Sequence, residues 1–227
     1  MKRSEINRII KDAIQFFEQM NFKLPRWAYW GPGKWIEESR RVKNIRELML
    51  GWDLTDFGGN DFKNKGLILF TLRNGDLDKI VNSKRYAEKI MIVGENQETP
   101  MHFHWAKTED IINRSGGNLV LEICGSTEDE KYSSLPLQVK VDEMPQEVEP
   151  FGRIVLSPGE SICLEPLVYH RFYGEAGKGR ILVGEVSSVN DDKADNRFYE
   201  NEGRFPDIEE DEAPAYLLIN DYSNYLV

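Results

Sequence analysis

The sequence predicts an all-β core, an antiparallel barrel or sandwich, behind a helical N-terminal extension. After residue 66, about nine short strand-like segments follow one another without helical patterns between them. Turns such as 73–76 (RNGD) and 157–159 (SPG) separate these segments. One clear amphipathic helix lies near the N-terminus. We therefore expect one structural domain, in which a helical and aromatic extension (1–65) packs on a barrel with a C-terminal tail (66–227).

The extension begins with the amphipathic helix, for which Ser4 is the expected N-cap and Pro25 the end. The next stretch, 26–35 (RWAYWGPGKW), contains glycines and a proline that rule out a regular helix. Its tryptophans serve packing or a subunit interface, or else form a flap over a polar pocket, in which case Trp27 contacts substrate. A short helix is expected over 44–50.

The expected strands of the barrel are rich in β-branched and aromatic residues. They span residues 67–72, 86–93, 101–105, 118–124, 137–141, 153–156, 161–164, 170–173 and 180–187.

The composition narrows the class of partner. The formal net charge is −10, which argues against a nucleic acid or an anionic membrane. No apolar run approaches the ~20 residues of a membrane-spanning helix, and charged residues interrupt any signal-like stretch at the N-terminus. Cys124 and Cys163 lie far apart in apolar segments, which is typical of reduced core thiols in a cytoplasmic protein.

The three histidines of the chain form a pattern that predicts a metal site. His102 and His104 are two residues apart, so on a strand both rings point to one face. Glu109 follows and can return from the next turn, and His170 arrives on a later strand. Three imidazoles and one carboxylate suit a divalent first-row metal and leave positions open for a substrate.

The segment 102–116 reads H-x-H, four residues, E, six residues, G, and this spacing resembles the first motif of the cupin superfamily. The resemblance implies a double-stranded β-helix, or jelly-roll barrel. The second cupin motif is matched less well, because no glycine stands between Pro166 and His170.

Most of the chain further resembles the D-lyxose isomerase family of sugar ketol-isomerases. The matching segments are 27–30 (WAYW), 57–58 (FG), 100–105 (PMHFHW), 168–172 (VYHRF), 184–192 (GEVSSVNDD), 195–198 (DNRF) and 204–212 (RFPDIEEDE). By position, the resemblance places the metal ligands on His102, His104, Glu109 and His170. It also implies Mn²⁺ as the metal and a homodimer as the assembly.

The implied reaction interconverts D-lyxose and D-xylulose, with D-mannose and D-fructose as a second pair. A metal that chelates O1 and O2 of the open-chain sugar acts as a Lewis acid, and a base that is not a ligand moves the proton between C1 and C2. Lys89 is one candidate for a catalytic group outside the metal ligands, either as a base or as a hydrogen-bond donor to a sugar oxygen. It alternates in phase with residues that are expected to face inward. For the base, Glu185 on a strand competes with Glu202, and we favour Glu202 because it lies in a glycine-containing loop.

Asp192, Asp195 and Arg197 follow the last strand and either bind sugar hydroxyls or form a local salt-bridged turn. Rival functions are another metal cupin, such as a sugar-phosphate isomerase or an oxygenase, and a non-catalytic sugar-binding protein. No strong Gly-rich phosphate loop is present, which favours an uncharged sugar.

Overall fold

The computed structural model describes residues 1–77, 83–191 and 194–226. Its helical elements are α1 (Arg3–Gln19), η1 (Arg26–Tyr29), α2 (Pro32–Glu37), α3 (Lys43–Glu47), η2 (Ile219–Asp221) and α4 (Tyr222–Tyr225). Its strands are β1 (Gly51–Thr55), β2 (Leu67–Arg73), β3 (Tyr86–Val93), β4 (Thr99–Phe103), β5 (Glu109–Gly116), β6 (Leu119–Gly125), β7 (Leu137–Val141), β8 (Met144–Val148), β9 (Gly152–Leu156), β10 (Ser161–Leu164), β11 (Val168–Gly174), β12 (Ile181–Ser188) and β13 (Arg197–Phe198).

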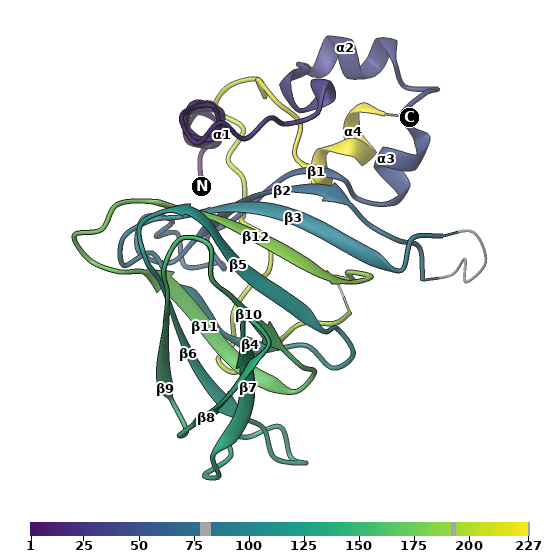
Figure 1. Cartoon of the computed structure of the whole chain (residues 1–227). Coiled ribbons are helices and arrows are strands. Elements are labelled where there is room, and N and C mark those ends of the chain that lie inside the picture. The colour runs from purple at the N-terminus through teal and green to yellow at the C-terminus, as the bar shows by residue number, and fades with distance from the viewer. Residues whose placement is uncertain (78–82, 192–193, 227) are drawn as a thin grey trace.

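These strands form two antiparallel sheets that enclose a common core (Figure 1). The larger sheet has the order β1-β2-β3-β12-β5-β10-β7-β8, and the smaller has the order β13-β4-β11-β6-β9. Apolar side chains from the inner faces of both sheets fill the space between them. This architecture confirms the predicted all-β core and is that of a cupin-type jelly-roll barrel.

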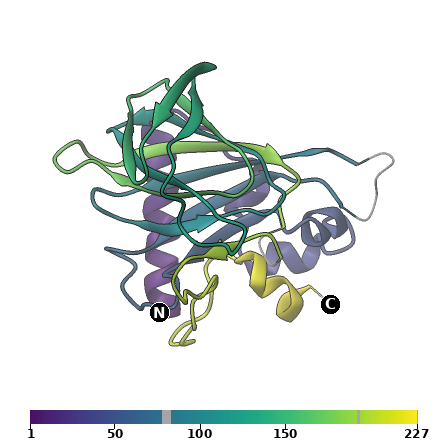
Figure 2. The ribbon, with the colours of Figure 1, turned by 90° about the horizontal axis from the view of Figure 1, so that it is seen from below.

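The alternation of side chains along β2 and β3 gives the larger sheet two buried faces. Leu69 and Met91 point into the barrel, whereas Phe70 and Ile90 belong to a second apolar cluster on the outer face. Helix α1 crosses that outer face and covers it with its apolar stripe (Figures 1 and 2). Side chains of the N-terminal extension therefore pack in one apolar cluster with the outer face of the larger sheet, and residues 51–55 add β1 to the edge of that sheet.

Most predicted strands are confirmed to within two residues, but β1, β5, β8 and β13 were not predicted. The reason is clearest for β5, whose inner face carries Glu109 and Asn113 beside Ile111. All three side chains are buried, so the strand faces the barrel interior although two of them are polar. Hydrophobic alternation cannot detect a strand whose buried residues are polar.

The expectation for the start of α1 was wrong. The helix begins at Arg3, and the N-cap residue Lys2 makes no side-chain capping bond. Ser4 instead donates from its backbone N–H and its hydroxyl to the two carboxylate oxygens of Asp211, at 2.9 and 2.7 Å. A carboxylate from the C-terminal tail thus supplies the acceptor that a local side chain usually provides.

A buried ion pair fastens the C-terminal tail to α1. The Arg3 guanidinium is 1% exposed and donates to both carboxylate oxygens of Asp221, at 3.0 and 2.8 Å. Glu210 accepts two further hydrogen bonds from the same guanidinium. These bonds satisfy the buried charge of Arg3 and hold the C-terminal tail at the start of α1. Figure 2 shows the end of this tail beside the short helices.

In the described part of the chain, no helix has the length and apolar character needed to cross a membrane. Both cysteines are free thiols, with Cys124 buried and Cys163 partly buried, in agreement with the prediction.

Candidate metal centre and catalytic pocket

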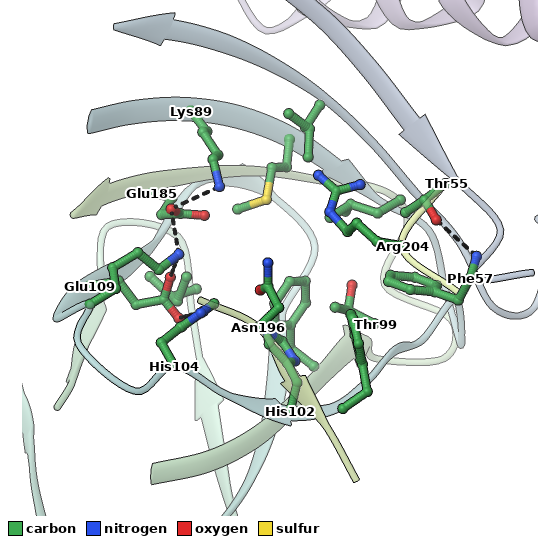
Figure 3. A pocket seen from close by; sticks show the side chains of 17 residues that line it. Thr55, Phe57, Lys89, Thr99, His102, His104, Glu109, Glu185, Asn196 and Arg204 are labelled. Carbon is green, nitrogen blue, oxygen red and sulfur yellow. Dashed lines mark hydrogen bonds and ion pairs between the residues drawn. The ribbon is translucent and has the colours of Figure 1, made fainter. Parts of the chain in front are cut away.

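Strands β4, β5 and β11 bring the predicted metal ligands together, and Figure 3 shows three of them, His102, His104 and Glu109. His102 on β4 is the register partner of His170 on β11. His104 follows the end of β4, and Glu109 begins β5 in the opposite sheet. All four side chains are buried. One ring nitrogen from each histidine lies within 4.8 Å of the others, so the three imidazoles can reach a single ion.

Backbone carbonyls fix the orientation of every imidazole. The Nδ1 atom of His102 lies 2.8 Å from the Pro100 carbonyl oxygen, and that of His170 lies 3.0 Å from the carbonyl oxygen of Val168. The Nδ1 atom of His104 faces the Asp195 carbonyl. Since a carbonyl only accepts, each Nδ1 must carry the proton. The neutral ring then directs the lone pair of Nε2 into the pocket, which is the form that binds a metal.

Two buried acceptors in this group face each other without a hydrogen between them. Nε2 of His170 lies 3.1 Å from Oε1 of Glu109, yet neither atom has a hydrogen-bond partner. Nε2 of His104 is 3.4 Å from the same oxygen. Two lone pairs at this distance repel and are costly to bury, unless a cation lies between them. The residues present therefore fit a divalent metal held by three imidazoles and one carboxylate.

The pKa shifts of two candidate ligands, His102 and Glu109, agree with this assignment. Burial lowers the pKa of His102 well below its usual value, and the nearby His170 and His104 lower it further. Burial also acts to raise the pKa of Glu109, but Lys107 and His104 outweigh it, so this pKa lies well below its usual value. Neutral imidazoles and an ionised carboxylate are the protonation states that metal binding requires.

A row of alternating charges leads away from the candidate ligands along the inner face of the larger sheet (Figure 3). Lys107 Nζ lies 2.7 Å from Glu109 Oε2 and 3.0 Å from Glu185 Oε1. Lys89 Nζ lies 3.3 Å from the same Glu185 oxygen and donates to Asn190 at 2.7 Å. Lys89 and Glu185 are register partners on β3 and β12. The predicted inward direction of both side chains is thus confirmed.

The structure does not support Glu202 as the base. Its carboxylate pairs with Lys65 at 2.6 Å and lines a separate hollow, outside the pocket that contains the histidines. We correct this expectation, because a loop position after the strands did not place the side chain at the pocket. Of the two carboxylates, Glu185 is the one beside the ligands.

Three predicted sugar-binding residues have other roles, and a fourth lies outside the described residues. Asp195 accepts from the backbone N–H groups of residues 105–107 and holds His104 through its carbonyl, so it positions a ligand. Arg197 pairs with Glu130 at 3.0 Å, which is a long-range ion pair and not the local salt-bridged turn that was the alternative. Trp27 packs against Phe70, on the outer face of the sheet, with ring centres 4.8 Å apart. Asp192 is not among the described residues.

The pocket also contains residues that were not predicted. Polar ones are Thr55, Thr99, Lys107, Asn196 and Arg204, and the aromatic ones are Phe57, Phe172 and Phe198. Lys107 could have been found, because it precedes Glu109 by two residues and continues the phase of the unrecognised strand β5. Asn196 and Arg204 belong to the C-terminal segment, and no periodicity indicates which of its residues reach the pocket.

We expect the metal-free protein to lose stability as the pH falls below about 6.5, the ordinary pKa of histidine. His102 has a lowered pKa in the folded state, so the unfolded chain binds more protons in that range and unfolding becomes more favourable. Thermal unfolding of the chelator-treated protein from pH 5 to 8 measures the effect. Nitrogen NMR of the His102 imidazole should show a neutral ring with Nδ1–H at pH 7. A His102 signal that titrates near 6.5 would contradict the assignment.

The barrel and this pocket define the class of protein: a cupin-type barrel with a candidate metal centre and an adjoining carboxylate between two lysines. The model of the family described as D-lyxose isomerase matches residues 1–222 of the chain. Relatives called D-lyxose/D-mannose isomerase are 46% identical over all 227 residues (Serratia proteamaculans, the whole of both chains) and 47% identical over 226 residues (Escherichia coli O157:H7, 99% of this chain and 100% of the relative). The chain belongs to the D-lyxose isomerase family and is a sugar ketol-isomerase.

Solved structures support the fold. The L-ribose isomerase of Acinetobacter sp. DL28, in complex with L-ribose, is 16% identical and has a TM-score of 0.60, over 88% of this chain and 93% of that one. The Cellulomonas parahominis L-ribose isomerase with L-ribose is 15% identical and has a TM-score of 0.59, over 92% and 98%. At these identities the similarity shows the shared architecture.

Proposed function

We propose that this protein is a metal-dependent isomerase that interconverts D-lyxose and D-xylulose, with D-mannose and D-fructose as a second pair. The observation that carries the proposal is the Glu185 carboxylate, held between two ammonium groups at the edge of the candidate metal centre. The names of the relatives, which are 46% and 47% identical, support the choice of sugars.

His102, His104, His170 and Glu109 would hold the metal. When bound there, a divalent ion such as Mn²⁺ supplies Lewis-acid polarisation of the sugar carbonyl and hydroxyl oxygens. The aromatic and aliphatic walls of the pocket exclude water around the reacting carbons, which strengthens the electrostatic interactions there.

Glu185 is the proposed base. Its carboxylate removes the proton from C2 of the open-chain aldose and returns it to C1, while the hydroxyl proton passes from O2 to O1, so that the aldose becomes the ketose without gain or loss of atoms. Glu185 and Lys89 are mid-strand residues in the centre of the larger sheet. Rigid strands therefore fix the base relative to the ligands on β4 and β11.

Lys107 and Lys89 orient the base and neutralise its charge. Both lysines are buried, and an ammonium group in such a place needs nearby carboxylates. Lys107 bridges Glu109 and Glu185 and thereby links the candidate ligand set to the base. Either ammonium group can also donate a hydrogen bond to a sugar oxygen on which negative charge develops.

We expect ketose formation from D-lyxose to cease after treatment with a chelator and to return when Mn²⁺ is added. The measurement uses a panel of free aldopentoses and aldohexoses, with D-lyxose and D-mannose as the expected substrates. Unchanged turnover in metal-free protein would contradict metal dependence. Oxygen uptake and sugar-phosphate conversion, measured in parallel, test the rival cupin reactions. Light scattering of the purified protein tests the homodimer, which stays a prediction.

A further inference from the structure

We propose that Thr99 and Arg204 form a second subsite in the pocket, which binds the distal hydroxyl groups, at C4 or C5, of the open-chain sugar. This inference rests on the proposed function, because it assigns the far end of the same substrate. In the proposed function, the candidate metal centre and Glu185 act on C1 and C2 of the sugar. The polar residues at the opposite end of the pocket have no role in that proposal (Figure 3).

The Thr99 hydroxyl is a buried polar group that lacks a partner. The residue is 3% exposed, lines the pocket, and its Oγ1 atom makes no hydrogen bond. Leaving a hydroxyl unsatisfied in an apolar site costs free energy, and such a group in a native protein calls for an explanation. A hydrogen bond between Oγ1 and a substrate hydroxyl would explain why this hydroxyl has no partner within the protein.

An irregularity in strand pairing directs Thr99 into the pocket. Three steps along β4, from Thr99 to His102, face only two steps along β11, from Phe172 to His170. Residues three apart on a regular strand point to opposite faces. The extra residue of this β-bulge restores the phase, so that Thr99 and His102 both line the pocket.

The spacing along β4 fits the length of the substrate. The bulged segment from Thr99 to His102 lies opposite two residue steps of β11, so it covers roughly 7 Å. An extended open-chain pentose whose first two oxygens lie at the histidines therefore brings its last hydroxyls near Thr99. The lining of the pocket combines these polar groups with apolar side chains such as Phe172 and Met91.

Arg204 completes the far end from the other side of the pocket (Figure 3). Its Nη2 atom lies 2.5 Å from Oδ2 of Asp53, a buried residue of β1. The stacking of Arg204 over the Phe205 ring, at 4.9 Å, further limits its orientation. A guanidinium fixed in this way presents its planar N–H groups at the wall of the pocket, and little conformational entropy is lost when it binds hydroxyl oxygens.

The test combines deletion of the enzyme hydroxyl with deletion of substrate hydroxyls. Thr99→Val, which preserves shape, is compared with wild type in the manganese-loaded enzyme. The substrates are D-lyxose and its 4-deoxy and 5-deoxy analogues. For D-lyxose we expect kcat/KM to fall about tenfold, mainly through KM, because one buried hydrogen bond is lost. With the analogue that lacks the partner hydroxyl, wild type and Thr99→Val should differ by less than about twofold.

Two further variants make the result specific. Thr71→Val changes a buried threonine of β2, in the other sheet, that does not line the pocket, and it should leave kcat/KM within about twofold of wild type. Arg204→Lys keeps the charge beside Asp53 but loses the planar donors, and it should raise KM for D-lyxose. Equal metal content and melting temperature show that each variant is folded.

The outcomes separate the two proposals. Suppose that the wild-type enzyme isomerises D-lyxose. If Thr99→Val then has the same kcat/KM as wild type, or if its kcat/KM falls by the same factor for D-lyxose and for both analogues, the subsite is wrong and the proposed function stands. If wild type shows no isomerisation of free sugars, the proposed function fails, and the subsite fails with it.

Discussion

Replacing Glu185 by glutamine is expected to lower kcat for D-lyxose by about 10²- to 10⁴-fold, the contribution of a positioned acid–base group. Glutamine has nearly the same shape but cannot accept the C2 proton. The loss should appear in kcat rather than KM, because the proton moves only in the transition state. Steady-state kinetics on the manganese-loaded variant measure it, and metal content should remain that of the wild type.

Glu202→Gln is the matched control for this experiment. It makes the same chemical change at the glutamate that the sequence analysis favoured as the base. The Glu202 carboxylate pairs with Lys65 and lines a separate hollow. We expect kcat within about twofold of wild type, because this carboxylate does not line the pocket that contains the histidines. The reverse result, with Glu185→Gln active and Glu202→Gln inactive, would show that the loop moves to the pocket and that our assignment is wrong.

Running the reaction in D₂O distinguishes proton transfer from a hydride shift. A proton held on the Glu185 carboxylate can exchange with solvent before it returns to carbon, so deuterium should appear at C1 of the ketose. Transfer of hydride directly between the two carbons would leave C1 without deuterium. In that case the role of Glu185 would be limited to moving the hydroxyl proton.

The sequence predicted the parts of the site that strand periodicity controls. His102 and His104 share a face because they are two residues apart, and Lys89 and Glu185 point inward because each alternates in phase with apolar core residues. His170 and Glu109 came from their spacing to the first pair. For all of these, local geometry together with one buried face determines the direction of the side chain.

The remaining residues depend on features that periodicity does not describe. Thr99 is out of phase with His102, and only the bulge between β4 and β11 brings it into the pocket. Arg204 is held at the pocket by an ion pair with Asp53, a residue far from it in the sequence. Asp195 lies beside His104, but its carboxylate accepts hydrogen bonds from the backbone of the turn at residues 105–107 and not from a sugar. Loop side chains such as these are fixed by tertiary contacts.

Loss of one histidine tests the metal centre itself. We expect His170→Ala to weaken Mn²⁺ binding by more than about 100-fold, beyond the 10- to 100-fold cost of losing a hydrogen-bond partner of a ligand. The ring contributes one of the two facing lone pairs that make the site suitable for a cation. Calorimetric titration of chelator-treated protein with Mn²⁺ measures the affinity directly, so the result does not depend on turnover.

The facing lone pairs also affect how the stability of His170→Ala responds to metal. Without metal, Nε2 of His170 and Oε1 of Glu109 are buried acceptors that oppose each other, and removing the imidazole relieves the repulsion. The cavity left by the ring offsets part of this gain. We therefore expect Mn²⁺ to raise the melting temperature of wild type but not that of His170→Ala, since only a species that binds the native state stabilises it.

Glu122→Gln provides the control on the same strand pair. Glu122 is buried on β6 and accepts hydrogen bonds from Arg171, the neighbour of His170, but it does not line the pocket with the histidines. Its replacement should lower stability through the loss of a charged acceptor and leave Mn²⁺ affinity unchanged. If His170→Ala binds Mn²⁺ as tightly as Glu122→Gln does, the ion lies elsewhere, and the facing lone pairs of His170 and Glu109 need another explanation.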